Sequence, residues 1–307
     1  MRTSELAGQR TLAARLQVNC FESRSWVAPA DGILEIRAMG AGGAGAKRTV
    51  VTNTATGGYS GSWGIKRVRI KKGDAVTVSI GAAGAVAGTG LPGGNGGNTT
   101  ITVNGVSYVA YGGPGGLWSS AASIAMPAGP APSANWDYGA ASVRPGMLAG
   151  QATGGAGVDI MAKGNDATTS DASAGSGGGG SAFPSVGTRG GGAMPGGEDA
   201  LGGYPSSAPG GYFDATDGGW GISFYGGGAG TSYGSGAYNG GNGGGGGGTN
   251  TGTGGRGGNG GGGGGGGSNT GTGGAGGIGG GGGSGMNNGG AGGPGYACLN
   301  FFLDKGV

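Results

Sequence analysis

Apolar and polar residues alternate over several short stretches in the first third of the chain, namely 34–38, 65–71, 76–80 and 101–108. A period of two places successive side chains on opposite faces of a β-strand. Within 65–71 we expect Val68 and Ile70 to face a core while Arg67, Arg69 and Lys71 face out. Residues 21–112 are therefore predicted to form β-structure.

Turn residues separate these stretches. Asn104-Gly105 is suited to a type I′ turn, so 101–108 predicts a hairpin, and Gly73-Asp74 turns the chain after 65–71. Another apolar run, 296–303, lies close to the C-terminus. We expect six or seven antiparallel strands in a small β-sandwich base, made of 24–112 and 294–307 and closed by the C-terminal strand.

Glycine changes this picture, because it accounts for 94 of the 307 residues and falls in a Gly-Gly-X phase in tracts such as 254–259, 273–278 and 290–294. A left-handed helix with about three residues per turn places every third side chain on one edge and makes no internal hydrogen bonds. Such tracts are either solvated and disordered or packed side by side as a polyglycine-II bundle. Collagen is rejected, because it requires strict Gly-X-Y with abundant proline.

Two features favour the bundle. The Asn- and Thr-rich stretch 249–256 recurs as 268–275, so each repeat can be one rod and one turn, and the chain returns from glycine to the apolar run 296–303. We assign 113–293 to a polyglycine-II bundle with long irregular loops. The fold class expected is mostly β and polyglycine-II, and its one helical candidate lies at the N-terminus.

That N-terminal candidate belongs to an attachment segment, residues 1–23. Ser4 can cap a short amphipathic helix in which Leu6, Leu12 and Leu16 recur at helical spacing. The alternative for this stretch is a frayed terminus.

Aromatic side chains gather in the non-repetitive segments between the glycine tracts. Tyr and Trp together with Ser, Gly and Asn are typical of binding surfaces, and loops on a rigid scaffold commonly carry recognition. The alternative is that these aromatics cap the ends of the bundle. The candidate binding residues are Trp118, Trp136, Tyr138, Tyr204, Tyr212, Phe213, Trp220, Phe224, Tyr225, Tyr233 and Tyr238.

Charge and chemistry add little that points to catalysis. Residues 1–72 hold twelve Lys and Arg against four Asp and Glu, whereas the rest of the chain is mildly acidic, and there is no histidine. We interpret the basic part as a strand face or docking surface and expect no nucleic-acid partner, no cofactor, no metal and no enzymatic activity. Cys20 and Cys298 are expected to be buried thiols, with a disulfide as the alternative. Without a signal-peptide pattern, synthesis and folding in a cytoplasm are expected.

Several stretches resemble a known group of proteins. They are 25–32, 40–45, 57–61, 72–81, 96–100 and 292–297. Together they resemble the glycine-rich modules at the tips of bacteriophage tail fibres and in other phage tail proteins, over roughly residues 24–303. That resemblance implies a polyglycine-II fold whose variable loops bind a receptor on the host surface. This chain departs from the pattern in its basic N-terminal segment and its longer loops.

The resulting hypothesis is a tail-fibre or tail-tip adhesin in the virion tail. Its partners would be a host outer-membrane protein or surface glycan and, through the N-terminal region, other tail proteins, with the chain present as a homotrimer or a single copy. The alternative is a structural tail or baseplate component without receptor contact. Two further alternatives are weaker. An ice-binding protein does not account for the irregular aromatic loops, and a polysaccharide-degrading enzyme requires a catalytic constellation that the sequence does not offer.

Overall fold

A computed structural model describes residues 15–50, 53–86, 88, 91–120, 124–142, 144–145, 155–156, 246, 252–258 and 270–303. Within these residues every regular element is a strand, every strand pairing is antiparallel, and none of the elements is a helix. The prediction of a mostly β chain is therefore confirmed for this part. No helix long and apolar enough to cross a membrane occurs there either.

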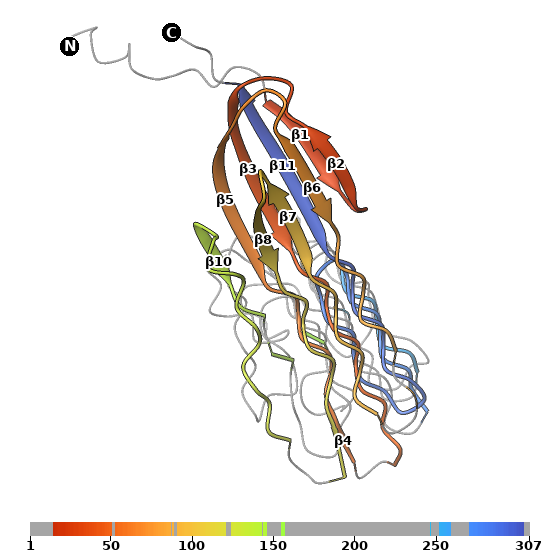
Figure 1. Cartoon of the computed structure of the whole chain (residues 1–307). Coiled ribbons are helices and arrows are strands. Elements are labelled where there is room, and N and C mark those ends of the chain that lie inside the picture. Colours follow the sequence, from red (N-terminus) through yellow and green to blue (C-terminus); the bar gives the residue numbers. More distant parts are fainter. Residues whose placement is uncertain are drawn as a thin grey trace, which may run out of the picture.

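The larger sheet has five strands, and the C-terminal run forms one of its inner members (Figure 1). Strand β11 lies between β1 and β3 and pairs with β3 over its whole length. Leu16, which the helical spacing at the N-terminus included, lies in β1, so that spacing does not continue as a helix; Ser4, Leu6 and Leu12 lie outside the described residues. In sheet order the strands are β1 (Arg15–Cys20), β11 (Tyr296–Leu303), β3 (Gly32–Met39), β5 (Trp63–Ile70) and β10 (Tyr138–Ala140).

A second sheet has four strands and contains the predicted hairpin. Asn104 and Gly105 have φ values of 49° and 80°, the left-handed conformation at both central positions that a type I′ turn requires. The hairpin prediction is thus confirmed. The sheet order is β2 (Arg24–Val27), β6 (Ala75–Ser79), β7 (Thr99–Val103) and β8 (Val106–Ala110), while β4 (Thr54–Ala55) and β9 (Trp118–Ser119) form a separate pair.

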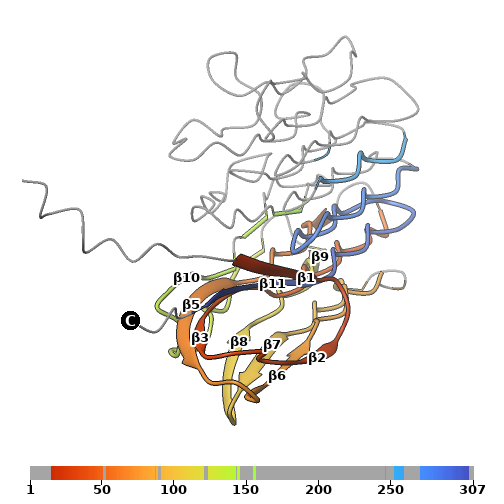
Figure 2. The same ribbon diagram turned by 90° about the horizontal axis from the view of Figure 1, so that it is seen from above.

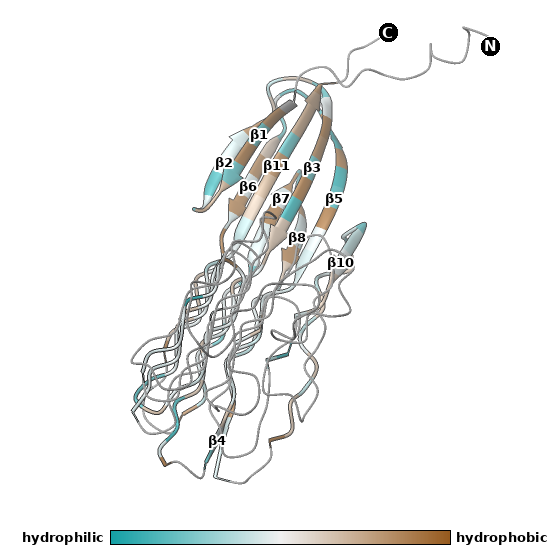
Figure 3. Ribbon diagram, turned by 180° about the vertical axis from the view of Figure 1, so that it is seen from behind, coloured by the Kyte–Doolittle hydropathy of each residue, from teal (hydrophilic) through white to brown (hydrophobic). Residues whose placement is uncertain are grey.

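One hydrophobic core draws buried residues from both larger sheets, which lie against each other when viewed from above (Figure 2). Leu34 and Ile36 of β3 are completely buried, as are Val76 of β6 and Ile101 of β7. Polar residues alternate with these apolar positions along β3 and β5 (Figure 3). Ile70 is buried and Val68 packs against the core while Arg67 and Arg69 are exposed, as the period of two predicted.

Glycine-rich stretches, here called the glycine segments, leave the strand ends and run together away from the sheets (Figure 1). Five of them join directly to β3, β5, β7, β8 or β11, and a sixth follows β6 after one residue. The segments are 40–46, 56–62, 81–86, 93–98, 111–117, 271–277, 280–285 and 288–295.

Hydrogen bonds between the glycine segments repeat every three residues, and segment 40–46 shows the pattern most completely. Residues 40, 43 and 46 donate to 56–62, residues 41 and 44 to 93–98, and residues 42 and 45 to 288–295, at N–O distances of 2.9 to 3.1 Å. Carbonyl groups of the same segment accept from 84, from 113 and 116, and from 282 and 285. Segment 40–46 is therefore hydrogen-bonded to six neighbouring segments.

Close approach explains why most of these positions are glycine. A Cβ atom on Gly42 would overlap the carbonyl oxygen of Gly280, and one on Gly58 would overlap that of Gly43. Ala41 and Ala44, spaced by three, carry the tolerated side chains and are fully buried. The Gly-Gly-X phase thus places glycine where backbones meet and a small side chain where one fits.

Asparagine closes one edge of this arrangement. In segment 93–98, Asn95 and Asn98 again stand three residues apart, and both are exposed. Their side-chain oxygens accept from the N–H groups of Gly115 at 2.8 Å and Gly112 at 3.0 Å. The amide side chains thereby bind donors that a further glycine segment would otherwise satisfy.

Candidate functional site

Three of the predicted binding aromatics lie within the described residues, and they occupy different environments. Trp136 is only 9% exposed and belongs to the hydrophobic core, where its indole N–H donates to the carbonyl of Val109 at 3.0 Å. Its ring also packs on Tyr108, with centroids 5.7 Å apart. The Trp136 side chain therefore packs into the core, although the residue itself lies in the loop that precedes β10.

Trp118 and Tyr138 are more accessible to solvent, but they belong to different sheets. Trp118 is half-buried in β9, opposite Ala55 of β4. Tyr138 lies in β10 at the edge of the five-stranded sheet, is 60% exposed, and places its ring edge-on to Trp63 with centroids 5.4 Å apart. The structure does not bring these two side chains into one site.

The remaining candidates belong to the long inserts and lie outside the described residues. They are Tyr204, Tyr212, Phe213, Trp220, Phe224, Tyr225, Tyr233 and Tyr238.

Turns at the far end of the glycine segments carry exposed apolar side chains that the sequence patterns did not single out. Segment 40–46 runs away from β3 and 56–62 returns to β5, so the described residues of the connection between them, 47–50 and 53–55, lie far from the two larger sheets. The same holds for 86, 88, 91 and 92, between β6 and β7. Val50, Val86 and Leu91 on these turns are 49%, 46% and 56% exposed. Apolar side chains in solvent at the end of a long molecule are available for contact with a partner.

A charged network on the five-stranded sheet is the most elaborately built polar feature among the described residues. It lies on the outer face, defined here as the face turned away from the core, which includes Glu35 and Arg37 of β3, Arg67 of β5 and Asn300 of β11. Glu35 is only 3% exposed although it is charged. Alternation of Glu35 with Leu34 and Ile36 indicated an outward position but not this burial.

Two arginines and an amide hold the Glu35 carboxylate. Arg37 approaches Oε1 through Nε at 2.9 Å and Nη2 at 2.8 Å, and Arg67 approaches Oε2 through Nε at 2.8 Å and Nη2 at 2.7 Å. Asn300 donates its amide to Oε1 at 3.3 Å. Burial by itself raises the pKa of Glu35, but the hydrogen bonds from Arg67 and Arg37 outweigh it, and the pKa falls below its usual value.

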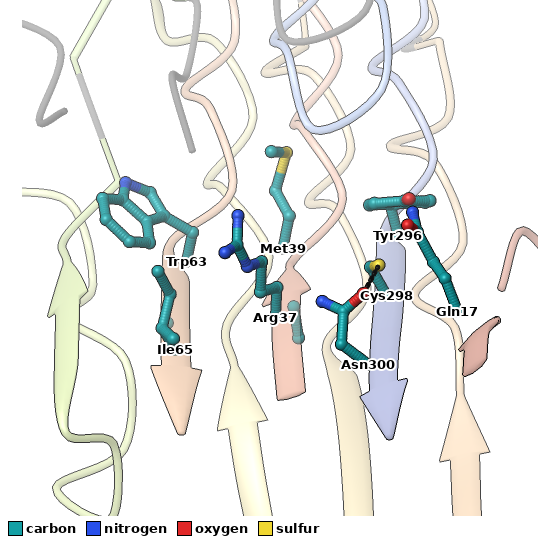
Figure 4. A pocket seen from close by; sticks show the side chains of 10 residues that line it. Gln17, Arg37, Met39, Trp63, Ile65, Tyr296, Cys298 and Asn300 are labelled. Atoms are coloured by element: carbon teal, nitrogen blue, oxygen red, sulfur yellow. Dashed lines mark hydrogen bonds between the residues drawn. The ribbon is translucent and has the colours of Figure 1, made fainter. Parts of the chain in front are cut away.

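Beside this network the outer face is hollowed into a small cavity of about 140 Å³ (Figure 4). Trp63 and Ile65 line it on one side, Tyr296, Cys298, Asn300 and Gln17 line it on the other, and Arg37 and Met39 lie between them. Burial raises the pKa of Tyr296 to about 12, so its hydroxyl remains protonated and donates to Asn19 at 2.7 Å.

The two cysteines do not form a disulfide, and both are buried as thiols, as expected. Cys20 lies opposite Ala297 and belongs to the core, whereas Cys298 lies opposite Asn19 and lines the cavity on the outer face. Because successive residues of a strand point to opposite faces, the sheet separates the two sulfur atoms. Burial raises the pKa of the Cys20 thiol.

No protein-family model matches the sequence, and no curated protein matches it either. Among the described residues, no three His, Cys, Asp or Glu side chains gather closely enough to hold a metal ion.

Proposed function

We propose that this chain is a bacteriophage tail-fibre or tail-tip adhesin of the virion tail, made in the host cytoplasm. In this proposal the two larger sheets form a β-sandwich base, the glycine segments form a polyglycine-II bundle, and loops at the far end bind a receptor on the host surface. The observation that carries the proposal is the three-residue hydrogen-bond repeat, combined with its position between a folded base and exposed turns.

The hydrogen-bond repeat favours polyglycine-II because that helix has three residues per turn and no internal hydrogen bonds. Successive N–H groups then point about 120° apart and reach three different neighbours, which is how residues 40–46 donate. An extended β-strand would alternate between two directions instead. The shared core between the two antiparallel sheets supports the sandwich in the same way.

A hydrogen-bonded bundle supports adhesion by holding loops at a distance from the base without allowing them to move freely. Loops that are already positioned lose less conformational entropy when they bind. Connections between the segments reach the end of the molecule that is far from the sheets, where Val50, Val86 and Leu91 are exposed. The receptor on this proposal is an outer-membrane protein or a surface glycan, contacted by these turns and by the aromatic inserts such as 198–225.

The base then attaches the adhesin to other tail proteins through the N-terminal region, as one copy or as a homotrimer. Support comes from the excess of basic residues in 1–72 and from the exposed arginines of β5. The β5 arginines lie in the five-stranded sheet, at the end of the chain's architecture opposite to the exposed turns (Figure 1).

Binding of fluorescently labelled protein to cells of candidate host species tests the proposal. We expect saturable binding that is lost when 198–225 is deleted and weakened by Leu91→Asp, which places a charge on a far-end turn. Val106→Asp is the matched control, because Val106 is similarly exposed, at 47%, but adjoins the β7–β8 turn at the opposite end.

A structural tail or baseplate component is the second candidate. The packing of Trp136 in the core favours it, since one of the aromatic residues expected to bind a receptor stabilises the fold instead. If folded protein bound no host cells, and labelling of virions located the chain inside the tail, this second function would replace the first.

A further inference from the structure

We propose that the cavity on the outer face of the five-stranded sheet binds a carboxylate side chain of a partner protein, with Arg37 as its cationic ligand. This proposal goes beyond receptor binding, because it concerns the base and not the far-end turns. Its failure would leave the adhesin proposal intact, and loss of host-cell binding would leave this one intact.

Arg37 is held in a fixed orientation with part of its guanidinium group still available. Its Nε and Nη2 atoms point at Glu35, whereas its Nη1 makes no hydrogen bond to any described residue. The side chain is 36% exposed and projects among the cavity-lining residues in Figure 4. An arginine positioned in advance loses little entropy when its remaining N–H groups bind a second carboxylate.

The electrostatics of the cavity select an anion. Two arginines share the single carboxylate of Glu35, so this group of three side chains carries a net positive charge. None of the residues that line the cavity is Asp or Glu. A carboxylate entering beside Arg37 therefore meets no like charge within the cavity itself.

The remaining lining sets the size and polarity of the occupant. Met39, Trp63 and Ile65 form an apolar wall suited to the methylene groups of a side chain. A volume of about 140 Å³ has room for one side chain and not for a large ligand. A glutamate fits this lining, because its short apolar stem can contact the apolar residues while its terminal carboxylate binds Arg37.

The surroundings favour a protein segment over a free small acid. The cavity opens on an outer face where Arg67 is 68% and Tyr138 is 60% exposed, and Gln17 at its rim is exposed as well. A peptide segment carrying the glutamate can contact these groups, whereas a free acid reaches the cavity alone. Arg67 and Arg69, exposed on the same sheet, attract such a segment from a distance.

The test uses the full chain labelled with ¹³C-methyl methionine and follows the Met39 methyl resonance by NMR, which Met39→Leu identifies. The probe is the acetylated and amidated peptide Val-Glu-Val, compared with Val-Gln-Val, sodium propionate and inorganic phosphate. We expect a saturable shift with Val-Glu-Val and binding at least about tenfold weaker for Val-Gln-Val and for propionate, because a charged acceptor strengthens the bond to arginine and the peptide adds contacts.

Two variants should abolish the shift. Arg37→Gln removes the cation, and Gln17→Phe fills the cavity from its exposed rim while keeping the Glu35 network, so the second variant decides if the first fails to fold. Arg69→Gln is the matched control, since Arg69 is exposed on the same sheet outside the cavity. Equal binding of Val-Gln-Val, or undiminished binding by either variant, would overturn the proposal. If phosphate bound as tightly as Val-Glu-Val, the cavity would be a general anion site, and if propionate did, it would be a site for free acids. Either result would also overturn the proposal.

Discussion

The sheets and the glycine segments of this chain are held together by different means. In the sheets, large side chains such as Leu34, Ile101 and Leu299 fill one core, and the backbone groups of neighbouring strands bond to each other. In the glycine segments, backbone groups of six neighbours surround segment 40–46, whose own apolar side chains are alanines, and Tyr59 of segment 56–62 is the one large apolar side chain buried among the described glycine segments. One region is stabilised by the burial of apolar surface, the other mainly by hydrogen bonds between closely packed backbones.

This difference teaches where each region is sensitive to substitution. A hydrophobic core tolerates exchange among residues of similar volume. Glycine segments tolerate no added atom where a carbonyl occupies the space of a Cβ. Fixing the backbone of one residue costs about 1–2 kcal/mol of conformational entropy, and one hydrogen bond contributes about 0.5–1.5 kcal/mol net. The glycine segments therefore depend on nearly complete pairing of their backbone groups.

The largest effect is expected from Gly42→Val in a glycine segment. Its side chain would displace the carbonyl of Gly280 and break several inter-segment bonds, which we expect to destabilise the protein by about 4 kcal/mol or more. Thermal unfolding followed by calorimetry measures this. Gly88→Val is the matched control, because a Cβ there meets only Leu91 at 3.6 Å. Similar losses at both positions would contradict dense backbone packing around Gly42.

Leu34→Ala in the core should destabilise the sheets by about 3 kcal/mol, through lost burial and a residual cavity. Leu34→Met should cost less than about 1.5 kcal/mol, because volume is nearly conserved. Urea unfolding of both variants gives the two values. If Leu34→Met proved as damaging as Gly42→Val, the two regions would not differ in tolerance.

Glu35→Gln tests how much the buried carboxylate of Glu35, which is stabilised by hydrogen bonds within the five-stranded sheet, contributes to stability. We expect a loss of about 2 kcal/mol at neutral pH, because two arginines lose a charged acceptor. Folding lowers the pKa of Glu35, so its contribution is complete above the ordinary carboxyl pKa and disappears as the pH falls through the lowered value.

The pH dependence supplies the control for that variant. Melting temperatures measured from neutral to acidic pH should fall less steeply for Glu35→Gln than for the parent protein. Parallel curves would show that Glu35 does not contribute through its charge.

The smallest effect is expected at the edge of the glycine segments. Asn95→Ala removes the acceptor for the N–H of Gly115, which water can replace because Asn95 is exposed, so the expected loss is about 1 kcal/mol or less. Amide hydrogen exchange at Gly115 should accelerate, while exchange at Gly112, bonded to Asn98, should not. Unchanged protection at Gly115 would show that the side chain does not close this edge.

Local patterns allowed much of the fold to be predicted. Period-two stretches predicted β3, β5, β6 and β7, and Asn104-Gly105 predicted the hairpin of β7 and β8. Both signals depend on neighbours a few residues away, so both can be recognised in the sequence. Strand β1 was missed, since Leu16 fits a helical spacing as readily as a strand, and pairing with β11 decides the outcome. Trp136 lies in a loop, as predicted, but nothing local reveals that its side chain enters the core.

The candidate site was less predictable than the fold. Its polar network joins Glu35 to Arg67 and to Asn300, residues 32 and 265 positions away in the chain. Asn300 interrupts an apolar run, and this was the one signal in the sequence that its side chain has a polar partner. No pattern in the sequence indicated which strand would supply that partner.

The sequence by itself determined strands β3, β5, β6 and β7, the turn at Asn104-Gly105 and the three-residue phase of glycine, because each follows from the steric preferences of adjacent residues. Tertiary structure alone decided that β11 enters the sheet between β1 and β3, that segment 40–46 is surrounded by six others, and that Arg37 stands beside a cavity. These arrangements depend on hydrogen bonds and close packing between segments far apart in the chain, for which a local pattern supplies the capacity but not the partner.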